Sequence, residues 1–447
     1  MYSVPIMTRL AAGMAALLTL AGTAAGVLAA APPALAAGGS FTVLSYNVAG
    51  LPELISSAPT PRGPATTEIG RRIAPFDLVN VQEDFNYHAD LYATDTHPYR
   101  TPTSGGAGIG SGLNTVADFA YDGDDFERVR WKSCQYDSGD CLTPKGFTFM
   151  RTRLAEGVYV DVYNAHTNAG TNPGDLTSRA DNLSQLSAFI ASHSAGNAVL
   201  VMGDTNTRYT RTGDTIASFA AVNGLTDAWV RLERGGVPPV AGSDPLLCPE
   251  DNCEVVDKIL YRSSRAVTLT ATDYHNEHAA FLNAEGLMLS DHDPVSAAFT
   301  WSTNPAYQFS EQFGGPHGDY FTDITAVAAG ARATTLTVRA AARVDRIGLT
   351  LADGTVLGHG GTGGTEQKLT LASGEYLTSA TLCQGRYNNT TRIFSARFTT
   401  NTGRTLAAGT TTSDCATRTA PAGWQIAGFH GRTGAEVDKI GFIYTQR

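Results

Sequence analysis

The stretch Val199-Leu200-Val201-Met202-Gly203-Asp204-Thr205-Asn206 places an apolar run directly before a carboxylate and an amide. A short apolar run of this kind predicts a buried strand, here over residues 198–202. Asp204 and Asn206 are two positions apart, and side chains at that spacing in an extended chain point to the same side. The stretch therefore predicts a strand that ends in a polar cleft.

The same arrangement, an apolar strand with a polar residue at its end, recurs along the chain. The sequence predicts further strands over 41–46, 76–82, 158–164, 256–261 and 295–301. The polar residues beside them are Asn47 in VLSYNVAGLP, Glu83 in FDLVNVQED, His166 in VYVDVYNAHTN, Asp257 in DKILYR, and Asp291 with His292 in LSDHDPV. A helix is expected over 178–193, where apolar residues recur at helical spacing. Strands mixed with helices favour a sheet sandwich flanked by helices.

These residue types supply what the hydrolysis of a phosphodiester requires: a hard cation, a base that activates water, and donors for the charge that develops on phosphorus. Glu83 offers a carboxylate to Mg²⁺, or to another divalent cation such as Mn²⁺ or Ca²⁺. Asn47 completes or orients this metal site through its amide oxygen. Asp291 is a candidate for a further metal ligand or a brace.

His292 is the candidate general base, and Asp257 is suited to accept a hydrogen bond from its other ring nitrogen. Asp204 and Asn206 then face the phosphate, and His166 donates to a phosphoryl oxygen. Each residue taken singly also has a structural explanation, as a turn former, a solvated charge or a buried histidine. The whole set at successive strand ends favours a catalytic site.

At these residues the chain resembles the endonuclease/exonuclease/phosphatase superfamily, which includes secreted deoxyribonucleases and neutral sphingomyelinases. The motifs SYN, QED, NAH, GDTN, DKI and SDHDP follow in the family's order and cover residues 39–301. The resemblance implies a four-layer α/β sandwich of two packed β-sheets flanked by helices. It also implies a Mg²⁺-like cofactor at Glu83 and His292 as a base with a carboxylate partner.

The segment CQYDSGDCLTPKGFTFMRTRL, with Lys145-Gly146 before a strand, resembles the neutral sphingomyelinase branch, as do NVAGLPE and SGLNT. This resemblance implies cleavage of a phospholipid head group. A secreted nuclease is the alternative within enzymes, although a formal net charge of −10 gives no long-range attraction to nucleic acid. A glycan-binding protein without catalytic activity is the alternative of another class.

Composition changes after Trp301, and residues 302–306 are expected to form a linker to a second domain over 307–447. The runs FGGPHGDYFTD, LGHGGTGG and QIAGFHGRTGAEVDKIGFIY resemble the jacalin-like lectin domain, an all-β prism of three sheets. The resemblance implies a glycan site made by Gly314-Gly315 and by the loop from Gly434 to Asp438. A carboxylate suits this role because it accepts from two neighbouring hydroxyls. The alternative is that these residues only shape turns.

Residues 1–36 have the pattern of a signal peptide, with Arg9, an apolar stretch and the Ala34-Leu35-Ala36 cleavage pattern. The alternative is a membrane anchor. Cleavage predicts a secreted, extracellular protein with no transmembrane segment in its mature form. Export favours disulfides, and three pairs are expected: Cys134 with Cys141, Cys248 with Cys253, and Cys383 with Cys415.

Overall fold

The structure is a computed structural model that describes residues 37–106, 109–137 and 139–447. The predicted signal peptide over 1–36 lies outside the described residues. Within the described part of the chain, no helix has both the length and the hydropathy that crossing a membrane requires.

Two six-stranded sheets make up the part of the chain before the predicted linker. The first sheet has the order β11 (Val267–Asn276), β12 (Val295–Thr303), β1 (Gly38–Asn47), β2 (Leu78–Gln82), β4 (Asn114–Ala117), β3 (Tyr99–Arg100). The second has the order β5 (Glu127–Arg130), β6 (Gly146–Ala155), β7 (Val158–His166), β8 (Val199–Asp204), β10 (Asp257–Arg262), β9 (Thr226–Asp227).

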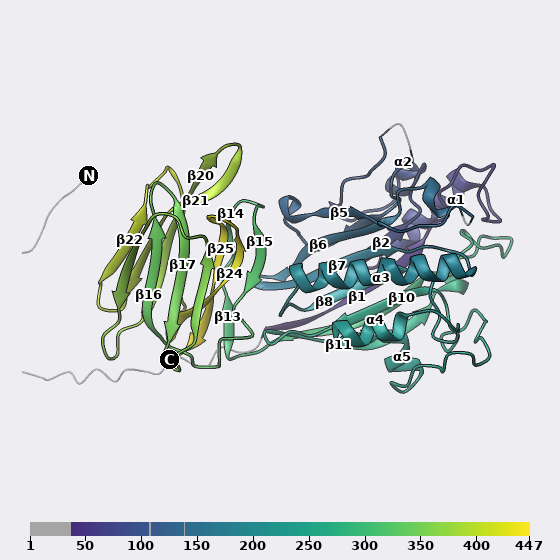
Figure 1. Ribbon diagram of the computed structural model, residues 1–447. Coiled ribbons are helices and arrows are strands. Elements are labelled where there is room, and N and C mark those ends of the chain that lie inside the picture. Colours follow the sequence, from purple (N-terminus) through teal and green to yellow (C-terminus); the bar gives the residue numbers. More distant parts are fainter. Residues whose placement is uncertain (1–36, 107–108, 138) are drawn as a thin grey trace, which may run out of the picture. The chain divides into compact units, whose positions relative to one another are not determined.

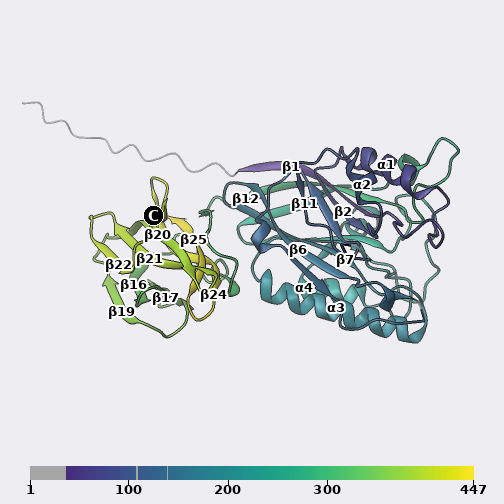
Figure 2. The same ribbon diagram turned by 90° about the horizontal axis from the view of Figure 1, so that it is seen from above.

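Helices lie on the outer faces of these sheets. The α-helices are α1 (Arg62–Ile73), α2 (His88–Tyr92), α3 (Pro173–His193), α4 (Ile216–Asn223) and α5 (Ala228–Glu233), and the 3₁₀ helices are η1 (Gly123–Asp125), η2 (Asp140–Leu142) and η3 (His278–Phe281). Figure 1 shows α3 and α4 beside the second sheet, and Figure 2 shows α1 and α2 on the opposite side. The order helix, sheet, sheet, helix confirms the predicted four-layer sandwich.

The predicted helix over 178–193 begins earlier in the structure. α3 starts at Pro173, and Asn172 and Asp175 form a reciprocal capping box at its first turn. Proline is favoured at a first helical position because its missing N–H has no partner to lose there. The apolar periodicity begins only after this turn, which is why the pattern alone placed the start too late.

Each sheet contains one parallel pair joined by a helix. β1 runs parallel to β2 through α1, with Asn47 opposite Gln82, and β7 runs parallel to β8 through α3, with His166 opposite Asp204. Parallel strands bring their carboxyl ends to the same edge of a sheet, and ligand-binding sites commonly form at that edge. Four of the six predicted strand ends therefore meet at one edge of the sandwich.

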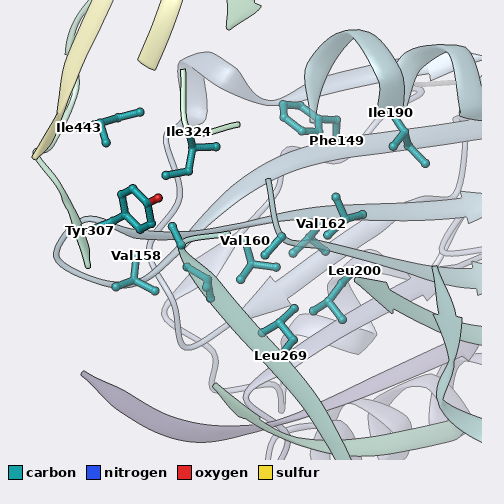
Figure 3. Packing of buried hydrophobic residues seen from close by; sticks show 14 of the residues in the cluster. Phe149, Val158, Val160, Val162, Ile190, Leu200, Leu269, Tyr307, Ile324 and Ile443 are labelled. Atoms are coloured by element: carbon teal, nitrogen blue, oxygen red, sulfur yellow. The ribbon is translucent and has the colours of Figure 1, made fainter. Parts of the chain in front are cut away.

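The core between the sheets is apolar. Figure 3 shows Val160, Val162 and Leu200 of the second sheet packed near Leu269 of the first. All four side chains are buried. Burial of apolar surface is the main favourable term in folding, so this contact holds the two sheets face to face.

Buried amides cross between the sheets below this edge, where the strand ends meet. Asn80 Nδ2 donates to the carbonyl of Tyr163 at 3.0 Å, and Gln82 Nε2 donates to Asn164 Oδ1 at 2.8 Å. Asn164 Nδ2 donates hydrogen bonds to the carbonyls of Val81 and Asn114 at 3.0 Å each. A buried amide is costly unless it is paired, so this network fixes one relative position of the two sheets.

Three antiparallel sheets make up the rest of the chain, as expected for a jacalin-like prism. The first has the order β13 (Tyr307–Phe309), β25 (Val437–Gln446), β24 (Trp424–Thr433), β15 (Asp319–Thr322), with β14 (Phe313–Gly314) paired to β25. The second is β18 (Val356–Gly360), β17 (Val344–Leu351), β16 (Ala333–Ala340), β19 (Thr365–Thr370), and the third is β22 (Thr405–Gly409), β21 (Thr390–Thr400), β20 (Leu377–Tyr387), β23 (Asp414–Thr419).

The cysteines are joined in the three expected pairs, Cys134 with Cys141, Cys248 with Cys253, and Cys383 with Cys415. Cys383 and Cys415 face each other on the neighbouring strands β20 and β23. The domain boundary over 302–306 stays a prediction, and strand β12 ends inside that range.

His430 makes the stability of the second domain depend on pH. Its ring is buried, Nδ1 lies 2.8 Å from Gln312 Nε2, and Nε2 lies 3.1 Å from the carbonyl of Ser310. Burial lowers the pKa of His430 to about 3. In the unfolded chain this histidine binds a proton near pH 6.5, whereas in the folded chain it stays neutral until about pH 3. The free energy of unfolding therefore falls as pH drops from 6.5 towards 3, by up to about 1.4 kcal/mol per pH unit. Urea unfolding of the wild type and of His430→Gln measures this, and an equally steep decline in the variant would contradict it.

Candidate active site

Asn47 joins the two sheets at the edge where the strand ends meet. Its Nδ2 donates to Glu83 Oε1 at 3.2 Å and to Asp204 Oδ2 at 3.1 Å. Its Oδ1 accepts from the backbone N–H of Ala49 at 3.0 Å, and this donor requires the amide oxygen to point there. The side chain therefore orients the carboxylates of Glu83 and Asp204 through its nitrogen. The sequence predicted instead that its amide oxygen completes or orients the metal site.

Glu83 lies one residue beyond β2, with a left-handed φ of 56°. Its carbonyl oxygen accepts from the backbone N–H groups of Gly50 and Phe85 at 2.9 and 2.8 Å. A Cβ on Gly50 would lie 2.2 Å from that oxygen, so only glycine permits the approach. The carboxylate is partly exposed, which leaves it accessible to a cation.

His166 and Asp204 form a buried pair at the ends of β7 and β8. His166 Nε2 lies 3.3 Å from Asp204 Oδ2 and 3.8 Å from Glu83 Oε1. Asp204 Oδ1 accepts from the backbone N–H of Asn206 at 2.9 Å, and Asn206 Nδ2 donates to the carbonyl of Thr167 at 3.2 Å. The structure therefore brings His166, Asp204 and Asn206 together as the sequence predicted.

His292 and Asp257 form the predicted dyad. His292 Nδ1 lies 2.9 Å from Asp257 Oδ2, and His292 Nε2 lies 3.7 Å from Asp204 Oδ2. Burial disfavours the charged ring, but the carboxylates of Asp257 and Asp204 outweigh burial and raise the pKa of His292 well above its ordinary value. Burial raises the pKa of Asp204, and His292 and His166 outweigh it, so that its carboxyl stays ionised with a lowered pKa.

The oxygen and nitrogen atoms around Asp204 are close enough to share a cation. Ligand atoms of Asp204, Asp257 and His292 lie within 4.8 Å of one another. Glu83 adds a carboxylate that shares the Asn47 amide with Asp204. Asp291 is exposed and accepts from Ser290 Oγ at 3.5 Å, so it lies at the surface beside this buried group rather than inside it.

Three residues outside the predicted set support this group through its neighbours or through their charge. Ser290 Oγ donates to the carbonyl of Asn47 at 2.7 Å and thereby ties the His292 loop to β1. Lys145 pairs with Asp140 and contributes positive charge that lowers the pKa of Asp204. Arg62, fully buried, is the third. Ser290 lies inside the SDHDP motif, but no pattern marked the side chain of Arg62.

Arg62 ties together two loops that carry site residues. Its Nη2 donates to the carbonyls of Val48 at 3.0 Å and Leu289 at 2.8 Å, and its Nη1 donates to the carbonyl of Thr60 at 3.2 Å. Val48 follows Asn47 directly, and Leu289 precedes Ser290. One guanidinium thus fixes the spacing of the loops on both sides of the site.

The predicted glycan residues also come together. Gly315 N donates to the carbonyl of Asp438 at 2.9 Å, and a Cβ on Gly314 would lie 2.1 Å from the same oxygen. Asp438 Oδ1 accepts from Arg392 Nη1 at 2.6 Å, while Oδ2 has no hydrogen-bond partner among the described residues. Burial raises the pKa of Asp438 to about 6, against the opposing effect of Arg392. Gly434 donates its N–H to the carbonyl of Glu436 at 3.0 Å and closes the loop.

The two sheets with this edge define a domain of the endonuclease/exonuclease/phosphatase class, and the three-sheet part defines a jacalin-like prism. A family model described as endonuclease/exonuclease/phosphatase family 2 matches residues 67–236, and one described as a jacalin-like lectin domain matches residues 310–443. The chain thus carries one domain that is similar to the first family and a second domain that matches the jacalin-like lectins.

Individual proteins are similar to parts of this chain. A sphingomyelinase of Mycobacterium bovis is 44% identical over 269 residues, which cover 58% of this chain and 53% of the relative. Horcolin of Hordeum vulgare subsp. vulgare is 33% identical over 120 residues, 26% of this chain and 82% of the relative. A Staphylococcus aureus beta toxin structure is similar at 16% identity and a TM-score of 0.40, over 57% of this chain and 99% of that one. The chain spans about half the length of the sphingomyelinases that it matches.

Replacing Arg62 by methionine is expected to destabilise the protein by about 3 kcal/mol, because three buried carbonyl groups lose a charged donor. Urea unfolding measures the change. Arg71→Met, on the same helix but exposed, is the matched control and is expected to change stability by less than about 0.5 kcal/mol. Equal effects of the two substitutions would contradict the role assigned to Arg62.

Proposed function

We propose that the protein is an exported, divalent-cation-dependent phosphodiesterase that cleaves sphingomyelin into ceramide and phosphocholine, and that its second domain binds glycans. The chain of contacts that runs through Asp257, His292, Asp204 and His166 carries the catalytic part of this proposal. The 44% identity to a sphingomyelinase supports the choice of substrate. Three disulfides support export, because such bonds persist in oxidising compartments.

His292 is the proposed general base. Its Nδ1–H donates to Asp257, so in the neutral ring Nε2 has a lone pair and faces the site. Nε2 takes a proton from water, and the water oxygen attacks phosphorus in line with the bond to ceramide. That bond breaks, the ceramide oxygen takes a proton from solvent, and phosphocholine leaves.

His166 and Asn206 are proposed to hold the phosphate. His166 Nε2 lies 3.3 Å from Asp204 Oδ2, and from this position it is proposed to donate to a phosphoryl oxygen. Asn206 uses one N–H of its amide on the carbonyl of Thr167, and an amide nitrogen has a second N–H to offer. These donors match the charge that develops on the phosphoryl oxygens.

Glu83 is the proposed main ligand of a divalent cation, with Asp291 as a further ligand or brace. The fit rests on the carboxylate of Glu83, which is partly exposed and held in place by Asn47. Mg²⁺ prefers such oxygen ligands and retains several waters, and Mn²⁺ and Ca²⁺ also bind oxygen. When bound, the cation neutralises the phosphate and offsets the carboxylate charge that raises the pKa of His292.

The glycan site is proposed at Gly314, Gly315, Gly434 and Asp438. Oδ2 of Asp438 is the available acceptor for a sugar hydroxyl, because Oδ1 is engaged by Arg392. Asp438 is fully buried, so a sugar reaches Oδ2 only if the residues that cover the carboxylate move. Binding to surface glycans raises the local concentration of membrane substrate without changing the chemistry.

The purified protein is expected to release phosphocholine from sphingomyelin vesicles when Mg²⁺ is present and to stop when EDTA removes the cation. His292→Ala is expected to lower the rate by about a thousandfold, because the base is lost. His275→Ala is the matched control, since His275 is exposed and pairs with Asp251 and Asp273, neither of which is a member of the dyad. Nicking of plasmid DNA without phosphocholine release would move the protein to the nucleases, and no hydrolysis of either would leave a lectin without catalysis.

Asp438→Asn is expected to lower affinity for the glycans that the wild type binds on a glycan array by at least about tenfold, because a charged acceptor is lost. Asp353→Asn is the control, since Asp353 is exposed and caps a local turn at Thr355. An unchanged binding profile in Asp438→Asn would place the glycan site elsewhere in the prism.

A further inference from the structure

Two arginines follow Asn206 in the loop that joins β8 to α4. Arg211 Nη1 donates to the carbonyl oxygen of Asn206 at 2.7 Å, and Arg208 Nη1 donates to the carbonyl oxygen of Glu254. Glu254 lies three residues before Asp257, where β10 begins. The two guanidinium groups are therefore attached to the backbone beside two residues of the candidate site.

Each guanidinium group has an edge that no protein atom engages. Among the described residues, only the Nη1 atoms of these two side chains donate hydrogen bonds. Nε and Nη2 of Arg208 and of Arg211 have no partner there and are not buried, and the Arg211 side chain is 24% exposed. Nε and Nη2 lie side by side and form a fork that binds two oxygens of one phosphate. Two such forks are thus open to solvent near Asn206.

Positive charge is in excess in this loop. The buried carboxylate of Asp214 pairs with both Arg179 and Arg211, through N···O distances of 2.7 and 3.0 Å. Within the described ranges, Arg208 has no ion-pair partner. Burial lowers the pKa of Arg208; the Glu254 carboxylate opposes this effect, and the nearby charge of Arg211 adds to it. Like charges that lie close together repel, so an anion bound between them stabilises the pair.

The loop that carries the two arginines is held in one shape by buried acceptors. Asp214 Oδ2 accepts from the backbone N–H of Arg208 at 2.9 Å, and Glu254 Oε2 accepts from Thr210 Oγ1 at 2.7 Å. Glu254 is buried, and the side chain of Asp214 has no exposed surface. Donors that are already positioned lose little conformational entropy when an anion binds.

We propose that Arg208 and Arg211 form a phosphate-binding subsite beside Asn206. The proposal rests on the proposed function for the choice of phosphate, because the same forks also fit sulfate. Binding is local, since a formal net charge of −10 gives the chain no general attraction to anions. The phosphate is either the scissile group of the substrate or a second phosphate next to it, and inhibition kinetics separate the two cases.

Calorimetric titration of the protein with inorganic phosphate in EDTA tests the subsite without metal and without hydrolysis. Arg208→Met keeps the apolar stem and removes the fork, and it is expected to raise the Kd for phosphate by at least about tenfold. Arg208→Lys keeps the charge without the fork and is expected to raise it by about threefold. Arg231→Met, at an exposed arginine on α5, is the matched control and is expected to change it by less than about twofold.

Inhibition of bis(p-nitrophenyl) phosphate hydrolysis by inorganic phosphate, with Mg²⁺ present, identifies which phosphate the subsite holds. Competitive inhibition that weakens in Arg208→Met would assign the subsite to the scissile phosphate. Non-competitive inhibition that weakens in the same variant would assign it to a second phosphate, because inhibitor and substrate then bind together.

Two outcomes would overturn the subsite. One is an equal Kd for phosphate in the wild type and in both Arg208 variants, with urea unfolding showing that all three are folded. The other is a wild type that binds phosphate only when Mg²⁺ is present or not at all, which would place the anion on the cation instead of the arginines.

The same variants separate the subsite from the proposed function. Phosphate binding that depends on Arg208, in a protein that releases no phosphocholine from sphingomyelin, would support the subsite and contradict the proposed substrate. Phosphocholine release by a wild type whose phosphate affinity is independent of Arg208 would do the reverse.

Discussion

The edge that carries the candidate site depends on hydrogen bonds that cross from one β-sheet to the other. Asn47 of β1 donates to Asp204 of β8, and the buried amides of Asn80, Gln82 and Asn164 cross just below. Apolar packing alone tolerates small displacements of one sheet over the other, whereas a buried amide must keep its particular partner. Because the proposed ligand Glu83 comes from one sheet and His166 from the other, this crossing network sets the distances on which the chemistry depends.

The strands and the main site residues could be predicted from sequence because both follow from short local patterns. An apolar run that ends in Asp204, Glu83 or His166 shows where a buried strand meets a polar edge, and the parallel pairs gather these ends. The amide orientation of Asn47 could not be predicted, since it depends on Ala49, whose φ is 48°. The contribution of Arg62 arises from partners as far as Leu289, and local patterns cannot show such a contact.

The second domain shows the same limit. Its glycines predicted the turns, and Gly314 does approach the Asp438 carbonyl so closely that no side chain fits. The ion pair between Arg392 and Asp438 joins residues 46 positions apart in the sequence. The motif alone suggests that the Asp438 carboxylate is accessible, whereas in the structure Arg392 is paired with it. The family pattern therefore locates the loop but does not predict this ion pair.

The dyad of His292 and Asp257 has one member on each side of the sandwich interior. His292 lies in the connection between β11 and β12 of the first sheet, while Asp257 begins β10 of the second. The length of the hydrogen bond between them, 2.9 Å, therefore depends on the distance between the two sheets. If heating increases the distance between the sheets without unfolding either one, this bond lengthens and His292 loses its alignment with Asp257. The alignment of His292 with Asp257 would then be lost at a lower temperature than the one at which the strands separate.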